Sequence, residues 1–305
     1  MNKQKFLITG SNGLLGQKLI NALANDDEVI LIATARGENR ARLKEGYEFV
    51  SMDITSPEQV RTVIHALRPD VVIHTAAMTQ VDDCEKEPMK CHLMNVDAVR
   101  FLALACHDVN AHFVHVSTDF IFDGSYGPLK EEAKPNPLSV YGKSKLESEQ
   151  VVQRIMKSWS IIRTVLVYGL ADEMSRSNIV LWAKDSLEAG KPIRVVNDQY
   201  RTPTLAEDLA QGCILAGLKK AQGVFNVSGE ELLSIADFVY RIADFWKLDT
   251  QLISEISSAS LGQPAKRPAR TGFIIDKAKD ILDYQPHSLE KGFQLIDAQL
   301  AARKA

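Results

Sequence analysis

Tyr141 and Lys145 stand four residues apart in a stretch whose pattern predicts a helix. On a helix, residues i and i+4 lie one above the other on the same face. A free tyrosine has a pKa of about 10, and a neighbouring ammonium lowers that pKa because it favours the phenolate. The pair is therefore suited to moving a proton onto or off a carbonyl or alcohol oxygen.

Two hydroxyl side chains, Ser117 and Thr118, end a predicted strand upstream of this pair. A hydroxyl placed there can donate a hydrogen bond to a substrate oxygen and stabilise the alkoxide that develops on it. Serine and threonine also end strands for reasons of turn geometry alone. We favour the chemical interpretation because Tyr141 and Lys145 follow Thr118 by 23 and 27 residues.

A glycine-rich turn near the start of the chain points to what moves with the proton. Its glycines have the spacing G-x-x-G-x-x-G and lie between a predicted strand and a predicted helix. The first two permit a tight turn and close approach by a pyrophosphate, and the third lets the helix pack against the sheet. Amides at the helix N-terminus then face the anion. The turn predicts a dinucleotide site formed by Gly10, Ser11, Asn12, Gly13, Leu14, Leu15 and Gly16.

Arg36 directly follows the second predicted strand, and Arg40 lies close behind it. NAD sites usually have an acidic residue there, which accepts hydrogen bonds from the ribose hydroxyls. A guanidinium instead suits the 2′-phosphate of NADP. We therefore expect NADP(H) as the cofactor, with Arg36 as its first candidate ligand. The alternative is NAD(H) beside a merely solvated basic loop.

Further candidate cofactor residues follow the next two predicted strands: Asp53 and Ile54, then Ala76 and Ala77. Asp53 could accept a hydrogen bond from the adenine amino group while Ile54 packs on the ring. A turn or helix-capping role for Asp53 is equally compatible with the sequence. The two alanines are small enough for a cofactor to lie against the backbone.

Short β-rich runs alternate with amphipathic helical stretches through the first half of the chain. Strands are expected at 5–9, 29–35, 48–52, 71–75, 112–117 and 160–166, and helices at 14–24, 57–67, 88–108 and 139–157. This alternation predicts an α/β fold with a Rossmann-like, doubly wound parallel sheet. Ligands in such folds lie beyond the carboxyl ends of the strands, where the candidate residues fall.

The pattern is less regular beyond residue 168. Helices are expected at 178–189, 204–218, 234–247 and 288–302, short strands at 193–196 and 224–227, and a loop over a substrate cleft at 254–270. We expect residues 1–168 to form the dinucleotide-binding domain with the catalytic residues. Residues 169–305 would form mostly a smaller α/β substrate-binding region, with some segments returning to the main sheet.

The composition is that of an ordinary soluble globular protein: 305 residues, 45% hydrophobic and 25% charged, with a net charge of −3. This charge gives no reason to expect nucleic acid or an anionic membrane as a partner. No apolar run approaches the roughly 18 residues of a membrane helix. The four cysteines and seven histidines show no metal-ligand spacing. We expect a cytoplasmic protein without a metal site.

These motifs together resemble those of the extended short-chain dehydrogenase/reductase family. The carriers are the glycine turn, Asp53, the Ser117-Thr118 pair and Tyr141-x-x-x-Lys145. Within that family, the chain is most similar to the dTDP-4-dehydrorhamnose reductases, over nearly its whole length. The matching segments are 68–73, 76–82, 117–124, 137–145, 194–200 and 267–268.

The resemblance implies NADPH-dependent reduction of the C4 keto group of a nucleotide-linked deoxysugar, with dTDP-4-dehydrorhamnose as substrate and dTDP-L-rhamnose as product. Tyr141 would protonate the C4 oxygen, and Thr118 would bond it. Lys145 would lower the pKa of Tyr141 and hold the nicotinamide ribose. The family also implies a homodimer. The substrate-binding residues would be Thr79, Val81, Thr118, Asp119, Asn178, Gln199, Thr202 and Arg267.

Two positions depart from the family pattern. Arg201 stands where glycine is common, and Leu166 stands where tryptophan is common. Both lie in the substrate half, so they bear on the sugar and the base rather than on the hydride chemistry. The substrate diphosphate needs cations, for which the candidates are Arg201, Lys266, Arg267 and Arg270.

Two other functions within the same fold stay open. The chain also resembles the regulatory β-subunit of methionine adenosyltransferase, which has the reductase fold and an NADP site but binds another subunit. A sugar-nucleotide epimerase or dehydratase is the third candidate. Asp119 occupies the place of the dehydratase acid, but Phe120 stands where dehydratases usually have glutamate.

Overall fold

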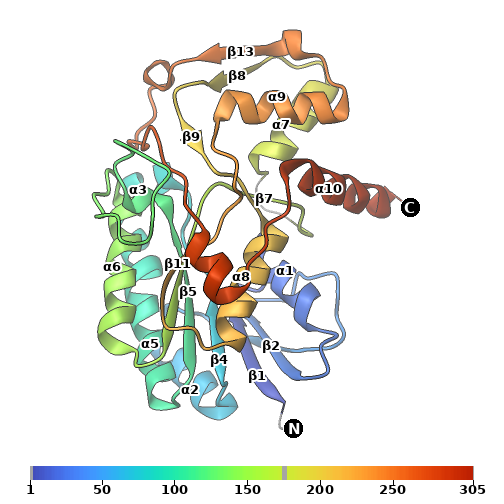
Figure 1. The fold of residues 1–305 in the computed structure, drawn as a ribbon. Helices are drawn as coiled ribbons and strands as arrows, with labels where there is room; N and C mark the ends of the chain where they lie inside the picture. The colour runs from blue at the N-terminus through green and yellow to red at the C-terminus, as the bar shows by residue number, and fades with distance from the viewer. Residues whose placement is uncertain (1–2, 174–176, 305) are drawn as a thin grey trace.

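The computed structural model, which describes residues 3–173 and 177–304, is built around a seven-stranded parallel sheet (Figure 1). The strand order is β11-β6-β5-β4-β1-β2-β3. Because the order reverses beside β1, the sheet is doubly wound, and the predicted fold class is confirmed. The strands are β1 (Gln4–Thr9), β2 (Val29–Ala35), β3 (Glu48–Ser51), β4 (Val71–His74), β5 (His112–Thr118), β6 (Trp159–Thr164) and β11 (Gly223–Asn226).

Successive residues of each strand pack against helices on opposite faces of the sheet. Phe6 and Ile8 of β1 face the layer that contains α1 (Leu14–Leu23) and α8 (Ala206–Leu218). Leu7, between them, faces the layer of α2 (Pro57–Leu67), α5 (Ala98–Asp108) and α6 (Val140–Ile155). Since both faces are covered, the strands are apolar without alternation, as parallel strands commonly are.

The helix expected at 88–108 is interrupted. It consists of α4 (Pro88–His92), a π-helical turn η1 (Leu93–Asp97) and α5. Within this turn, Asn95 Oδ1 accepts a 2.8 Å hydrogen bond from Met78 N, and Asn95 Nδ2 donates to Ser144 Oγ at 3.0 Å. The interruption therefore fastens the segment after β4, which continues into α3 (Val81–Lys86), to α6.

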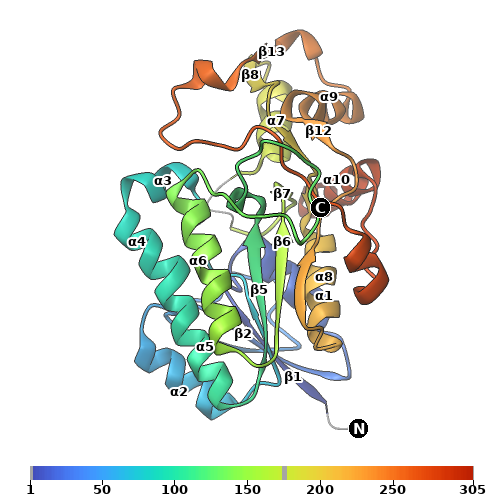
Figure 2. The ribbon, with the colours of Figure 1, turned by 60° about the vertical axis from the view of Figure 1, so that its left-hand side comes forward.

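A smaller region lies beyond the carboxyl ends of the main strands (Figures 1 and 2). Its core includes Tyr168, Phe238 and Phe293. It contains the helices α7 (Ile179–Glu188), α9 (Ile235–Trp246) and α10 (Leu289–Lys304). Three short strand pairs accompany them: β7 (Val167–Tyr168) with β10 (Thr204–Leu205), β8 (Ile193–Val196) with β13 (Ile253–Ile256), and β9 (Tyr200–Arg201) with β12 (Leu233–Ser234).

The loop expected at 254–270 is wrong at its start. Residues 253–256 form β13 and pair in parallel with β8, and residues 258–261 form a 3-10 turn. A four-residue strand with one partner leaves too short a pattern to recognise. Beyond residue 168, β11 and α8 belong to the main sheet layer. The domain boundary at 168 itself stays a prediction.

Over the described ranges, 3–173 and 177–304, no helix combines the length and apolar character that crossing a membrane requires. In the same residues, histidine, cysteine, aspartate and glutamate side chains form no group of three that could hold a metal ion. The four cysteines are free and buried.

Candidate active site

The glycine turn between β1 and α1 leaves no room for side chains at two of its three glycines. Gly10 has a φ of +73°, and a Cβ there would lie 2.7 Å from Ala76 N. A Cβ at Gly16 would collide with the carbonyl oxygen of Gly10. At Gly13 the nearest atom would be Gly10 O at 3.3 Å, which is a milder contact. The turn is therefore fixed by backbone contacts that only glycine allows.

The N-terminus of α1 is open to an anion. Its N-cap, Gly13, makes no side-chain capping bond, and the first turn contains no acidic residue. Asn12 holds the neighbouring basic loop, because its Oδ1 accepts from Arg40 N and its Nδ2 donates to Glu38 O, both at 2.8 Å. The uncapped amides, the glycine contacts and the adjacent arginine fit a dinucleotide phosphate.

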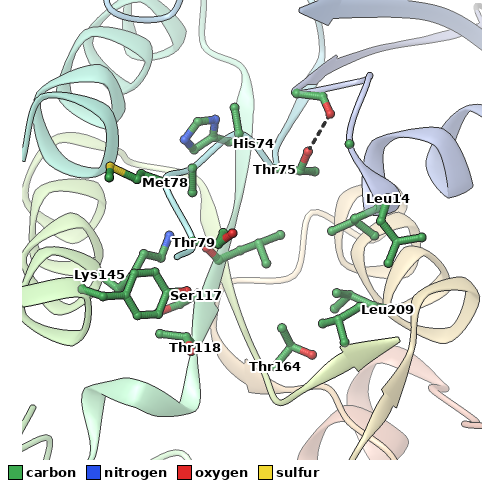
Figure 3. A pocket seen from close by; sticks show the side chains of 18 of the residues that line it. Leu14, His74, Thr75, Met78, Thr79, Ser117, Thr118, Lys145, Thr164 and Leu209 are labelled. Carbon is green, nitrogen blue, oxygen red and sulfur yellow. Dashed lines mark hydrogen bonds between the residues drawn. The ribbon is translucent and has the colours of Figure 1, made fainter. Parts of the chain in front are cut away.

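A cavity of about 700 Å³ joins this turn to the acid–base residues. In Figure 3, Leu14 and Leu209 lie on one side of it, and Lys145, Ser117 and Thr118 lie on the other. The cavity brings together many of the residues predicted from the sequence. These are Gly10, Asn12, Gly13, Leu14, Leu15, Ala76, Ala77, Thr79, Val81, Thr118, Asp119, Tyr141 and Lys145.

Helix α6 places Tyr141 beside Thr118. The helix begins at Ser139, whose hydroxyl accepts from Gly142 N at 3.1 Å. A Cβ at Gly142 would collide with Phe120 O, so glycine lets the first turn of α6 pack onto the residues that follow β5. Tyr141 is 8% exposed, and burial raises the pKa of its phenol, while a hydrogen bond with Thr118 lowers it.

Lys145 is held from behind by β5. Its Nζ donates to Val116 O at 2.7 Å and lies 3.4 Å from His115 Nε2. Burial lowers the pKa of Lys145 to about 8, against the opposing effect of Glu149. The influence of Lys145 on the phenol, which the resemblance implied, is not among the causes that shift the pKa of Tyr141 in this structure.

The two hydroxyls at the end of β5 have different partners. Ser117 Oγ donates to Glu149 Oε1 at 2.6 Å, and that carboxylate also accepts two hydrogen bonds from Arg163. Thr118 Oγ1 donates to Asp119 Oδ1 at the longer distance of 3.1 Å. The hydroxyl of Ser117 is thus committed to a buried ionic network. Of the two hydroxyls, that of Thr118 is therefore the better candidate to bond a reacting oxygen.

Five predicted cofactor residues do not line the cavity. Ser11 and Gly16 are buried in the turn beneath it, and Ser11 Oγ has no hydrogen-bond partner. Arg36 is exposed. Asp53 Oδ1 accepts hydrogen bonds from the Thr55 amide and hydroxyl, which is the turn role that the sequence left open. The last of the five is Ile54, which is 7% exposed.

Four predicted substrate residues also lie outside the cavity lining. Asn178 caps α7 and donates to Gly169 O, and Gln199 is buried. Thr202 is 1% exposed and accepts from Phe273 N. Arg267 forms an ion pair with Asp82 at 2.8 Å. The structure shows only their contacts within the protein, so their roles in substrate binding stay predictions.

The arginines suggested for a diphosphate are largely engaged elsewhere. Arg201 is 4% exposed and donates to main-chain carbonyls. Arg270 donates to Gly127 O and stacks over the ring of Tyr200. The expectation that Arg201 is an available cation is therefore wrong, because its side chain is enclosed by carbonyl groups and by Asp119.

The sequence analysis missed several residues that line the cavity. His74 and Met78 continue from β4, and Met94 comes from the π-helical turn. Their signal was weak: His74 lies in a buried strand, and the helix interruption that presents Met94 has no sequence pattern of its own. The others are Thr75, Val116, Phe120, Thr164, Val167, Glu173 and Leu209. Arg40, the second candidate for the cofactor phosphate, also lines the cavity, as do Ser117 and Leu166, which the sequence analysis had already noted.

Comparisons with known proteins agree with this geometry. The model of the family described as RmlD substrate binding domain matches residues 4–301. The chain is 32% identical over 266 residues to the spore coat polysaccharide biosynthesis protein SpsK of Bacillus subtilis (strain 168), covering 87% of each chain. It is 30% identical to the dTDP-4-dehydrorhamnose reductase of Aggregatibacter actinomycetemcomitans, over 96% of this chain and 98% of the relative.

A further relative and a solved structure complete the comparison. The chain is 29% identical to methionine adenosyltransferase 2 subunit beta of Xenopus tropicalis, over 85% of this chain and 77% of that protein. The structure of dTDP-4-dehydrorhamnose reductase from Bacillus anthracis in complex with NADP superposes with a TM-score of 0.84 at 28% identity. That match covers 97% of this chain and 99% of the other.

Proposed function

We propose that this chain, a member of the RmlD substrate binding domain family, reduces the C4 keto group of a nucleotide-linked deoxysugar with NADPH. The family lies within the extended short-chain dehydrogenases/reductases. The expected reaction converts dTDP-4-dehydrorhamnose to dTDP-L-rhamnose. The observation that carries the proposal is one cavity that joins the glycine turn to Thr118, Tyr141 and Lys145. The reductase names among the relatives support it.

The cofactor fits the residues present. Gly10, Gly13 and the uncapped start of α1 would hold the pyrophosphate. Arg40, which lines the cavity, and Arg36, at the end of β2, would bind the 2′-phosphate of NADP. When bound, NADPH supplies a hydride to the keto carbon. NAD(H) is the alternative where neither arginine contributes.

The proton is moved by the protein's own residues. Tyr141 donates its phenolic proton to the C4 oxygen, and Thr118 donates a hydrogen bond to the same oxygen as charge develops there. Lys145, four residues further along α6, would hold the nicotinamide ribose, the other role that the family resemblance implies for it. Burial excludes water from the three side chains, which strengthens these electrostatic interactions.

The test is an absorbance assay with NADPH and a panel of nucleotide-linked 4-ketohexoses. The wild-type protein should oxidise NADPH, fastest with the dTDP-linked sugar. Tyr141→Phe removes one hydroxyl, so kcat should fall at least about a hundredfold, because general acid catalysis contributes that much. NADPH binding should change little. Equal turnover by the two proteins would refute the assignment of Tyr141 as proton donor.

A regulatory role is the second candidate, favoured by the similarity to methionine adenosyltransferase 2 subunit beta. Such a protein would bind NADPH yet leave the whole panel of keto sugars unreduced, and it would co-purify with a catalytic partner. The same assay therefore separates the two functions. The homodimer and the cytoplasmic location expected from the sequence stay predictions.

A further inference from the structure

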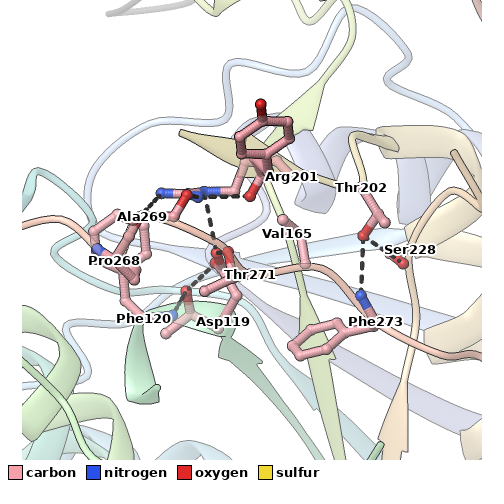
Figure 4. Close-up of polar contacts among 12 residues, drawn as sticks. Asp119, Phe120, Val165, Arg201, Thr202, Ser228, Pro268, Ala269, Thr271 and Phe273 are labelled. Carbon is pink, nitrogen blue, oxygen red and sulfur yellow. Dashed lines mark hydrogen bonds and ion pairs between the residues drawn. The ribbon is translucent and has the colours of Figure 1, made fainter. Parts of the chain in front are cut away.

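Arg201 and Asp119 form a charged pair that is withdrawn from water beside the acid–base residues. Their exposed fractions are 4% and 2%. Arg201 Nε lies 3.4 Å from Asp119 Oδ2, and the same oxygen accepts a 2.5 Å hydrogen bond from Thr271 Oγ1 (Figure 4). The other carboxylate oxygen, Oδ1, accepts from Thr118 Oγ1. One carboxylate thus links the Thr118 hydroxyl, which is proposed to bond the reacting oxygen, to a buried cation.

The remaining donors of Arg201 are directed at main-chain oxygens. Nη1 donates to Tyr200 O at 2.7 Å, and Nη2 donates to Pro268 O at 2.7 Å. Pro268 belongs to the strap, which we define as residues 265–273. Along its length the strap is hydrogen-bonded first to Asp82, then to Gly124 and finally to Leu129. Arg201 therefore joins β9, the strap and the end of β5, and it is not directed into the cavity.

The pair also governs charge near Tyr141. Burial raises the pKa of Asp119, and Arg201 is the largest influence that opposes this rise, ahead of the hydrogen bonds from Thr271 and Thr118. Among the influences on Tyr141, burial raises the phenol's pKa most, and the carboxylate of Asp119 raises it further. The groups that act on Asp119 are thus Arg201 from β9, Thr271 from the strap and Thr118 from β5, and Arg267 of the strap acts in turn on Arg201.

The hydroxyl of Thr118 has one proton and two acceptors that compete for it. Asp119 Oδ1 accepts it in this structure, whereas catalysis would require it at the reacting oxygen or at the Tyr141 phenolate. An isolated carboxylate in a dry site would hold that proton tightly and oppose ionisation of the phenol. A cation beside Asp119 Oδ2, the oxygen that does not bond Thr118, weakens both the hold on that proton and the opposition to ionisation of the phenol.

We infer that Arg201 is a positioning residue of the proposed reductase site: by pairing with Asp119 Oδ2, it leaves the Thr118 hydroxyl free to turn to the reacting oxygen and limits the repulsion between Asp119 and the Tyr141 phenolate. The kinetic part of this inference rests on the proposed function. The pairing of Arg201 with Asp119 does not, so the two parts are tested separately.

The pairing is tested by thermal unfolding of Arg201→Gln, Asp119→Asn and the double variant at pH 5 and pH 8. A carboxyl group whose pKa is raised in the folded state destabilises the protein as pH rises. Without Arg201 that pKa rises further, so the loss of Tm in R201Q should be larger at pH 8 than at pH 5. The double variant has no carboxylate at position 119, and its smaller loss should be the same at both pH values.

Two outcomes of the unfolding series would overturn the pairing. One is a loss of Tm in R201Q that does not depend on pH. The other is a double variant that is no more stable than R201Q at pH 8. If R201Q does not fold at pH 8, recovery of a cooperative transition in the double variant supports the pairing, and failure to recover counts against it.

The kinetic part is tested by the pH profile of kcat for NADPH oxidation. R201Q should lower kcat about tenfold or more at pH 7 and move the alkaline limb to higher pH, because the phenol becomes a weaker acid. R201K keeps the charge and should restore part of kcat. The limb of the double variant should return to that of D119N.

Asp82→Asn is the matched control, because it removes the ion pair that fastens the strap to α3 and leaves Arg201, Asp119 and Arg267 in place. Its alkaline limb should coincide with that of the wild type. A loss of kcat in R201Q with an unmoved limb would make Arg201 a purely structural residue. If the wild type itself oxidises no NADPH, the proposed function fails together with the kinetic part, while the unfolding series still decides the pairing.

Discussion

At the scale of single residues, Lys145 should set the alkaline limb of kcat/KM for the proposed reaction, whereas the phenol of Tyr141 sets the alkaline limb of kcat. Burial lowers the pKa of this ammonium to about 8, so it is charged below about pH 8 and loses its proton above. We expect kcat/KM, which reports the free protein, to fall as pH rises through this value. Lys145→Arg stays charged and should show no such fall, even if its kcat is lower. The same limb in both proteins would assign it to another group.

The expected preference for NADP over NAD should also depend on a single residue. Arg40 lines the cofactor cavity, whereas Arg42, two positions further along the loop, lines a different cavity beside α1. Arg40→Gln should weaken NADPH binding about tenfold, since a charged hydrogen bond contributes about 1.5–3 kcal/mol, and should leave NADH binding nearly unchanged. Arg42→Gln is the matched control. Equal titration curves for the two variants would place the 2′-phosphate elsewhere.

At the scale of elements, the turn between β1 and α1 depends on backbone contact rather than on flexibility. A Cβ at Gly16 would collide with the carbonyl of Gly10, so Gly16→Ala should destabilise the protein by about 3 kcal/mol. Gly13 has a φ of −80° and open space beyond 3.3 Å, so Gly13→Ala should cost about 1 kcal/mol or less. Denaturant unfolding measures both. Similar losses would show that the turn relaxes around a methyl group.

The same turn shows how far local patterns reach. Gly10 to Gly16 are recognisable because the glycines have geometric roles within seven residues, and because β1 before them and α1 after them have buried, apolar faces. The π-helical turn at Asn95 is not recognisable. It depends on hydrogen bonds to Met78 and Ser144, which are distant in sequence. Interruptions set by tertiary partners leave no periodicity to read.

The same distinction between local patterns and tertiary partners applies to the residues of the site. Residues whose role follows from a strand end or a helical spacing, such as Thr118, Tyr141 and Lys145, meet in one cavity as predicted. Charged residues in the irregular second half do not follow that logic. The exposure of Arg201 and Arg267 is decided by Asp119 and Asp82, which lie in other parts of the chain. A sequence shows which cationic side chains are present but not which carboxylates form ion pairs with them.

At the scale of the whole molecule, the strap joins the smaller region to the main sheet layer. Asp82 of α3 accepts hydrogen bonds from Arg267 Nη2 at 2.8 Å and from Ala265 N at 3.2 Å. The hydrogen bond from Arg267 is the main cause of the lowered pKa of Asp82. The tie is therefore present above the unfolded pKa of about 4 and lost as pH falls through the lower, folded value.

This tie allows the two roles of Arg267 to be separated. Asp82→Asn loosens the strap but leaves the guanidinium available, whereas Arg267→Gln loosens the strap and removes the cation. If Arg267 also binds the substrate diphosphate, R267Q should raise KM for the nucleotide sugar about tenfold more than D82N does, because a charged hydrogen bond to phosphate is lost as well. NADPH binding should be equal in both variants, since Arg267 does not line the cofactor cavity. Equal KM values would mean that Arg267 acts only by holding the strap against α3, and the diphosphate would then need another cation, for which the exposed Lys266 is the neighbouring candidate.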